Sequence, residues 1–150
     1  MKVRPSALIW RRNANQIEIL LMRYCYGGQD VLALPGGNPD RGEILPQTVV
    51  REIREELGVF IDVGEMILVG EMLLTQRNDD VLHVVFAARN LLGEPALNPA
   101  ETTALELVWK PIQELDKVNL YPNVGARIQE WFETKLDLGY IGRIEQQYFG

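Results

Sequence analysis

The chain has 150 residues, 47% of them hydrophobic and 24% charged, and its formal net charge is −6. This length and composition fit one globular domain spanning residues 1–150, and they exclude a disordered or low-complexity chain. The acidic balance argues against duplex nucleic acid as a partner.

The single cysteine and the first residues of the chain bear on the cellular compartment. Cys25 has no second cysteine with which to form an internal disulfide, and residues 1–8, MKVRPSAL, lack an apolar segment of secretory length. No apolar run approaches the roughly eighteen residues that cross a bilayer. We therefore expect a cytoplasmic protein with no membrane partner.

Three apolar segments near the start of the chain predict β-strands. Residues 3–10 and 17–24 are rich in aliphatic side chains and are separated by turn-prone asparagines, so we expect them to pair as a hairpin. A shorter apolar run, residues 31–34, predicts a buried strand that leads into a Pro-Gly-Gly loop at residues 35–37. Glycines in such a loop let the backbone approach an ion or a phosphate closely.

Residues 44–57 have the periodicity of a helix that buries one side. An apolar stripe recurs at helical spacing: Val49, Val50, Ile53 and Leu57. Pro46 falls in the first turn, where its missing N–H does no harm. At about 100° per residue, Glu52, Glu55 and Glu56 fall within one narrow arc beside that stripe.

These three glutamates allow two interpretations. Alternating Glu and Arg on a helix usually form a solvated face with surface ion pairs. Carboxylates crowded against a core instead repel one another, and a hard divalent cation offsets that repulsion. Oxygen ligands suit Mg²⁺ or Mn²⁺ rather than zinc, and Mg²⁺ keeps positions open for substrate phosphates. The sequence therefore predicts a magnesium site on this helix, with the solvated face as the alternative.

The second half of the chain continues the alternation of strands and helices. Residues 66–74 and 81–88 predict a second strand pair, and residues 105–109 predict a further strand. The polar residues 93–103 predict a loop between them, and residues 124–136 have helical spacing. A helix, a mixed sheet and a second helix predict a three-layer α/β/α arrangement.

Residues 37–59 resemble the Nudix box, the sequence motif of a known family. The motif is G-x5-E-x7-R-E-U-x-E-E-x-G-U, with U aliphatic, and all its specified positions are filled: Gly37, Glu43, Arg51, Glu52, Ile53, Glu55, Glu56, Gly58 and Val59. The resemblance implies the Nudix fold, an α/β/α sandwich with a mixed β-sheet. It also implies a pyrophosphohydrolase that uses Mg²⁺, which Mn²⁺ can replace, and attacks with water. Its substrate would be a nucleoside diphosphate linked to another group, such as a nucleoside triphosphate or a nucleotide sugar.

The same resemblance implies roles for individual residues. Glu52 and Glu56 would be the main metal ligands, Glu55 would assist them or act as the base, and the carbonyl of Gly36 would complete the set. Family members differ over which group is the base. Arg51 would hold a carboxylate of the box by a charge-assisted hydrogen bond, with Glu43 as its partner or as support behind the ligands.

Two acids and the single histidine outside the motif are weaker candidates. Glu101 and Glu106 would add a carboxylate to the site if they resemble the extra acids of some Nudix enzymes, although surface glutamates are commonplace. His83 lies within an apolar segment, where a lone histidine is more often packed or at an edge than a base.

Arginines and aromatic residues supply candidates for substrate binding. Arg23 and Arg77 would meet phosphate, although single arginines beside strands usually reach solvent. Tyr24 and Tyr26 are the better candidates for stacking on a nucleobase. The other aromatic residues considered are expected in the core: Trp10, Phe86 and Trp109.

The resemblance does not identify the substrate. The markers of the ADP-ribose and dinucleoside-polyphosphate branches are absent after the box, where residues 74–77 are Leu-Thr-Gln-Arg. The alternative class is a regulatory Nudix domain that holds a nucleotide without cleaving it, but all the box residues are present. The sequence leaves open whether the chain acts alone or as a homodimer.

Overall fold

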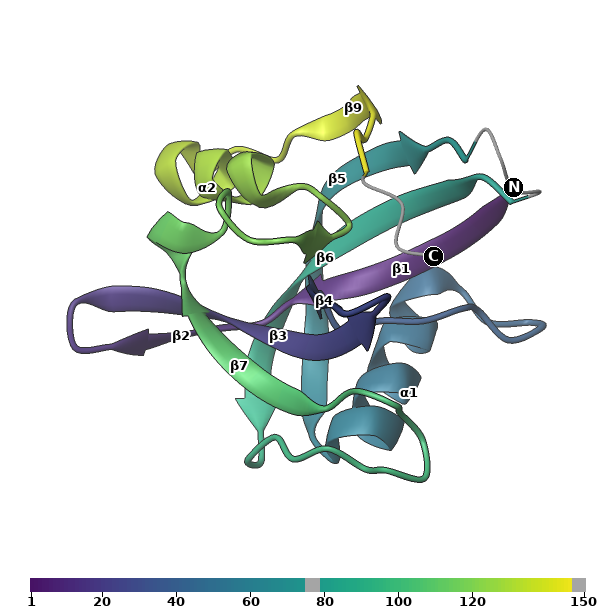
Figure 1. The fold of residues 1–150 in the computed structure, drawn as a ribbon, viewed down its shortest axis with the longest axis vertical. Helices are drawn as coiled ribbons and strands as arrows, with labels where there is room; N and C mark the ends of the chain where they lie inside the picture. Colours follow the sequence, from purple (N-terminus) through teal and green to yellow (C-terminus); the bar gives the residue numbers. More distant parts are fainter. Residues whose placement is uncertain (75–78, 147–150) are drawn as a thin grey trace.

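The computed structural model describes residues 1–74 and 79–146, and its strands form two sheets (Figure 1). The first sheet has the strand order β1-β6-β5-β9: Lys2–Leu8, Val81–Leu92, Phe60–Met72 and Gly139–Arg143. The second has the order β2-β3-β4-β8, with β7 also paired to β3: Trp10–Asn13, Gln16–Tyr26, Gln29–Ala33, Leu120–Tyr121 and Glu106–Pro111. Each sheet contains parallel and antiparallel neighbours.

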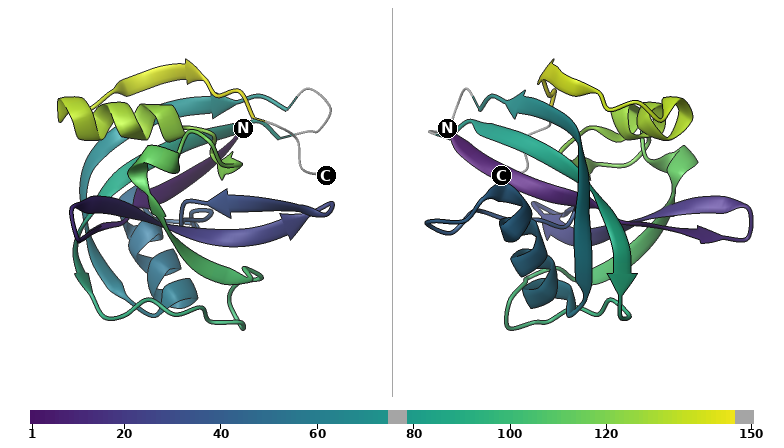
Figure 2. Two further views of the ribbon diagram at one scale, coloured as in Figure 1. Left: turned by 60° about the vertical axis from the view of Figure 1, so that its left-hand side comes forward. Right: turned by 180° about the vertical axis from the view of Figure 1, so that it is seen from behind.

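Two α-helices lie on opposite sides of the strands. In Figure 1, α2 (Gly125–Thr134) lies at the top and α1 (Leu45–Leu57) at the bottom. Figure 2 shows α1 against β1 and β5 from two further sides. A short 3₁₀ helix, Ile112–Glu114, follows β7. The α/β/α sandwich expected from the sequence is confirmed, with its strands divided between two mixed sheets.

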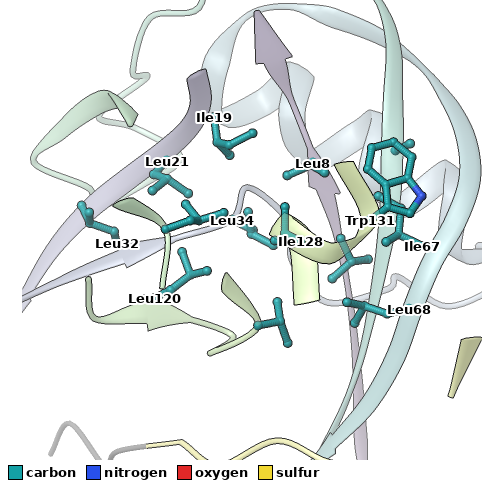
Figure 3. Close-up of a cluster of buried hydrophobic side chains, with 14 of the residues drawn as sticks. Leu8, Ile19, Leu21, Leu32, Leu34, Ile67, Leu68, Leu120, Ile128 and Trp131 are labelled. Carbon is teal, nitrogen blue, oxygen red and sulfur yellow. The ribbon is translucent and has the colours of Figure 1, made fainter. Parts of the chain in front are cut away.

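The hydrophobic core consists of two clusters, one under each helix. Beneath α2, Ile128 and Trp131 pack with side chains from both sheets, including Leu8, Ile19 and Leu68 (Figure 3). Beneath α1, the stripe of Val49, Ile53 and Leu57 packs with side chains of β1, β3 and β6. The apolar faces of the two helices therefore hold the sheets together from opposite sides.

The prediction that residues 3–10 form the first strand of a hairpin is wrong. Residues 3–10 do not form one strand, because the chain leaves the first sheet after Leu8 and joins the second at Trp10. β1 pairs in parallel with β6, and only the short β2 forms the hairpin with β3. Parallel partners are joined by long connections, so the turn that follows a strand does not reveal them.

The other expected elements are present with shifted ends. The strand expected at residues 31–34 is β4, and the expected second pair is β5 and β6, which run antiparallel and are longer than expected. The loop expected at residues 93–103 is a segment without regular structure. The strand expected at 105–109 is β7, and the helix expected at 124–136 is α2. Neither helix in the described ranges has the length and apolar character needed to cross a bilayer.

Candidate active site

Helix α1 begins and ends at residues that fix its position. The backbone N–H of Ile44 donates to Gln47 Oε1 at 3.0 Å, which is only one half of a capping box because Ile44 has no capping side chain. At the other end, Gly58 adopts a φ of +68° and its N–H donates to the carbonyl of Arg54 at 3.0 Å. This left-handed cap ends the helix just after its glutamates.

The carboxylates of α1 lie along the edge of the helix, beside its buried stripe. The side chain of Glu52 is 17% exposed and that of Glu55 is 35% exposed. Burial, followed by the negative charge of Glu52, raises the pKa of Glu56 to about 7. Burial also raises the pKa of Glu52. These acids therefore pack against the sheet, where negative charge is costly, rather than on a fully solvated face.

Arg51 connects this arc to the loop before the helix. Its Nε and Nη2 donate to the two carboxylate oxygens of Glu43 at 2.7 and 3.0 Å, as expected from the sequence. Its Nη1 donates to Glu52 at 3.0 Å and to Glu55 at 3.3 Å. The hydrogen bond from Arg51 is the largest of the interactions that lower the pKa of Glu43 to about 2. Arg51 thus orients three carboxylates from one guanidinium group.

The glycine loop lies directly against the arc. A Cβ atom built on Gly37 would contact the carboxylate of Glu52, with Oε1 at 2.6 Å. A Cβ atom on Gly36 would collide with the backbone of Pro5 and Ser6 on β1. A side chain at position 36 would clash with backbone, and one at position 37 would displace the Glu52 carboxylate, so the glycines allow the loop backbone to lie beside Glu52.

The donor set suits a hard divalent cation. The expected donors are the carboxylates of Glu52, Glu55 and Glu56 and the carbonyl of Gly36, and Mg²⁺ prefers oxygen ligands of this kind. Within residues 1–74 and 79–146, no three acidic, histidine or cysteine side chains are already gathered as a metal cage. Glu52 and Glu55 are instead held by Arg51. Burial is the main cause of the raised pKa values of Glu52 and Glu56, and the charge of a bound cation would lower them.

The loop at residues 93–103 adds a further acid to the site. Asn98 fixes the loop to the end of α1, because its N–H and its Nδ2 donate to the carbonyls of Glu56 and Glu55 at 2.9 and 3.2 Å. Glu101 then faces Glu56 across a groove of about 330 Å³. The groove is lined by Tyr24, Glu56, Pro99, Ala100, Glu101, Thr102 and Thr103.

The family model described as the NUDIX domain matches residues 2–132. The chain belongs to the Nudix family of hydrolases. No curated protein matches the chain. Among solved structures, a MutT NUDIX hydrolase from Burkholderia pseudomallei is 27% identical, with a TM-score of 0.63, and the match covers 75% of this chain and 84% of that chain.

Two other solved structures share the fold at lower identity. The ORF135 protein of E. coli is 23% identical, with a TM-score of 0.73, and the match covers 90% of this chain and 91% of that one. A MutT protein from Bacillus halodurans is 19% identical, with a TM-score of 0.73, and the match covers 100% and 94%. The shared fold therefore covers between 84% and 94% of each of the three structures.

Arg23, a candidate for phosphate binding, and Glu106, the second extra acid considered, are paired with other side chains. Arg23 donates to Glu106 at 2.7 Å and to Asp30 at 3.3 Å, so its charge is already paired and so is that of Glu106. Arg77 lies outside the described residues. Of the two additional acids considered, Glu101 reaches the groove and Glu106 pairs with Arg23.

Of the aromatic candidates, Tyr24 lies at the groove, Tyr26 is exposed, Phe86 is buried, and Trp10 and Trp109 are partly buried. Tyr24 lines the groove, its hydroxyl lies 3.2 Å from Thr102 Oγ1, and its ring stacks on Tyr26 at 5.9 Å. Trp10 packs edge-on against Trp131 and Phe132 beneath α2, and Phe86 lies in the cluster beneath α1. The guanidinium of Arg11 lies over the ring of Trp109, 4.2 Å from the ring centre.

Two polar residues near the start of the chain were not expected from the sequence. Arg4 and Ser6 lie on β1, and the side chains of both contain a buried atom that has no hydrogen-bond partner among the described residues. His83, on the neighbouring β6, is fully buried with both ring nitrogens unpartnered, and burial lowers its pKa to about 3. Polar residues at alternate positions of an otherwise apolar strand were the available signal.

Proposed function

We propose that this Nudix hydrolase cleaves a pyrophosphate bond in a nucleoside diphosphate linked to another group, in a Mg²⁺-dependent reaction with water as the nucleophile. The observation that carries the proposal is the arc of Glu52, Glu55 and Glu56. Its carboxylates are packed against the sheet with raised pKa values at two of them, beside a loop that admits no side chain. Nucleoside triphosphates and nucleotide sugars belong to this substrate class.

Glu52, Glu55, Glu56 and the Gly36 carbonyl would hold the cation. Bound Mg²⁺, for which Mn²⁺ can substitute, would supply positive charge to the pyrophosphate oxygens and weaken their repulsion of an incoming nucleophile. A carboxylate of the arc accepts the proton of the attacking water. Arg51 fixes the neighbouring carboxylates of Glu43 and Glu52 by hydrogen bonds of 2.7 and 3.0 Å.

Other residues position the arc and the substrate. Arg51 orients the carboxylates but has no free acceptor for a proton. Glu43 fixes Arg51 in turn and receives additional hydrogen bonds from the Asp40 N–H at 2.8 Å and the Thr48 hydroxyl at 3.0 Å. Tyr24 offers a ring at the groove beside Glu56. These contacts support positioning roles for Arg51 and Glu43 and a stacking role for Tyr24.

The experiment is a hydrolysis assay on a panel of nucleoside triphosphates, nucleotide sugars and dinucleoside polyphosphates. We expect a nucleoside monophosphate product with Mg²⁺ or Mn²⁺ and no turnover after treatment with EDTA. In H₂¹⁸O, one label should enter a product phosphate at the cleaved bond. Turnover that survives metal removal contradicts the proposed mechanism, and nucleotide binding without cleavage of any panel member indicates a regulatory domain.

A further inference from the structure

All the buried side-chain nitrogen and oxygen atoms that lack a partner in the described part of the chain belong to one cluster. They are Arg4 Nη1, Ser6 Oγ and the two ring nitrogens of His83. Arg4 lies opposite His83 in the parallel pairing of β1 with β6. Ser6 is two residues along the same strand, so its side chain projects to the same face of the sheet as that of Arg4.

This polar cluster, Arg4, Ser6 and His83, begins beside the glycine loop of the candidate active site. Ser6 forms an isolated bridge with Gly36, and Gly37 contacts the Glu52 carboxylate. The Nη2 of Arg4 donates to the carbonyl of Leu34, just before that loop, at 3.0 Å. A substrate whose phosphates lie at the arc therefore has its remaining part within reach of the cluster.

The cluster lies where the two sheets face each other, and Arg4 is its most exposed member. The guanidinium of Arg4 lies 5.1 Å from the ring centre of Tyr121 on β8, and the ring of His83 meets the same tyrosine edge-on at 5.1 Å. Arg4 and Tyr121 are only partly buried, whereas Ser6 and His83 are fully buried. The ring of Tyr121 therefore borders the cluster, with Arg4 at its more exposed end and Ser6 and His83 at its buried end.

The chemistry of the cluster favours a ligand that presents hydrogen-bond acceptors. Arginine is a donor only, and Nη1 of Arg4 has hydrogens to give. Because burial lowers the pKa of His83 to about 3, its imidazole is neutral near pH 7 and offers one donor and one acceptor. Guanine, uracil, thymine and cytosine carry a carbonyl oxygen, and guanine presents O6 and N7 together to an arginine. Adenine has no carbonyl and presents an amino donor instead.

We propose that the polar cluster binds the carbonyl-bearing edge of the substrate's nucleobase, with Arg4 as the residue that selects guanine and pyrimidine nucleotides over adenine nucleotides. This inference rests on the proposed function for the assignment of the substrate as a nucleotide. It assigns the arc to the phosphates and the cluster to the base. Ser6 and His83 hold the base edge from below while Arg4 reads its acceptor.

The test measures the affinities of the protein for GMP and AMP by NMR titration. The titrations are made in EDTA, and binding can be measured there without hydrolysis. Wild-type protein should bind GMP at least about tenfold more tightly than AMP, the scale of one good arginine–base contact. Arg4→Met should weaken GMP binding by about tenfold or more and leave AMP within about threefold. Arg12→Met, at an exposed arginine of β2, is the matched control and should change neither.

Several outcomes overturn the inference. Equal affinity of the wild type for GMP and AMP, or binding of neither, contradicts it. An equal loss of both nucleotides in Arg4→Met indicates that Arg4 binds the phosphate instead. If Arg4→Met does not fold, Arg4→Lys keeps the charge without the planar donor fork and should still lose the preference for GMP. A protein that prefers GMP but cleaves no pyrophosphate would refute the proposed function alone, and one that cleaves without base preference would refute this inference alone.

Discussion

Helices α1 and α2 bury their apolar sides in the same way but differ in how they carry charge. Ile53 of α1 and Ile128 of α2 are both fully buried at the centre of their clusters. On α2, the ion pair between Arg127 and Glu130 is 3.4 Å long, and its side chains are 49% and 45% exposed. On α1, the side chain of Arg51 is 19% exposed and contacts several carboxylates.

The difference shows that an amphipathic stripe by itself says nothing about function. A pair in open solvent contributes little to stability and can be lost without consequence. Acids held against a sheet have raised pKa values and require a specific partner. The charged edge of α1 is therefore where chemistry is expected, and α2 supplies matched controls for it.

The largest effect expected is on turnover in Glu52→Gln. This change keeps the size of the side chain but removes one charge from the arc, so turnover at saturating Mg²⁺ should fall by roughly 10²- to 10⁴-fold. Thermal unfolding in EDTA should occur at an equal or higher temperature, because repulsion within the arc is relieved. Glu130→Gln should retain wild-type turnover. If Glu52→Gln also retains it, the edge of α1 is no more functional than that of α2.

The apolar sides of the two helices should be equally sensitive. Ile53→Ala and Ile128→Ala each remove a fully buried side chain and should lower the free energy of unfolding by about 2–5 kcal/mol. Urea titration of both variants measures this loss. A loss below about 1 kcal/mol for only one of them would show that its helix packs less tightly than the other.

Arg51→Lys tests whether geometry or charge alone holds the arc. Lysine keeps the charge but cannot make the paired hydrogen bonds to Glu43, so Mn²⁺ affinity and turnover should each fall by roughly 10- to 100-fold. Calorimetric titration with Mn²⁺ and a product assay measure the two quantities. Arg127→Lys should change unfolding by less than about 0.5 kcal/mol and leave turnover unchanged. Wild-type metal affinity in Arg51→Lys would make the orienting role untenable.

The smallest effect concerns His83, where the fold excludes charge altogether. Its pKa is about 3 in the folded protein and about 6.5 when unfolded, so below pH 6.5 only the unfolded chain takes up the proton. The contribution of neutral His83 to the free energy of unfolding is fully present above pH 6.5. It decreases as the pH falls, by about 2 kcal/mol at pH 5. Urea unfolding of the wild type and His83→Leu at pH 7.5 and 5 measures the loss.

The comparison of those two proteins isolates His83. Glu56 contributes in the opposite direction, because its raised pKa favours the folded state as the pH falls, but it is common to both proteins. The free energy of unfolding should therefore fall further in the wild type than in His83→Leu. Identical pH dependence in the two would show that His83 accepts a proton in the folded state.

The part of the site that could be predicted from the sequence is the part built from neighbours in the chain. Helix α1, its buried stripe and the arc follow from spacing within residues 44–57, and the pairing of Arg51 with Glu43 spans only eight positions. Glu101 was a weaker candidate, because its approach to Glu56 depends on how Asn98 fixes a loop some forty residues away.

The partner of β1 and the polar cluster could not be predicted. β1 pairs with a strand that begins at Val81, and no local pattern specifies a parallel partner at that separation. The hairpin expected from the sequence placed Arg4 and Ser6 on a strand paired with residues 17–24. In the structure Ser6 is fully buried and Arg4 partly buried, on a strand that pairs with β6 and bridges to the glycine loop.

Gly37, at the start of the Nudix box, and Gly58, near its end, are glycines for different physical reasons. Gly58 is favoured for its positive φ, because a Cβ there would have nothing within 4 Å. Helix α2 ends at a similar φ of +63° with Lys135, a residue that has a side chain. An asparagine at position 58 should therefore be tolerated for about 1 kcal/mol. At Gly37 the demand is volume, since even a methyl group would occupy the space of the Glu52 carboxylate. An alanine at position 37 should therefore displace the Glu52 carboxylate, whereas a substitution at position 58 affects only the backbone at the end of the helix.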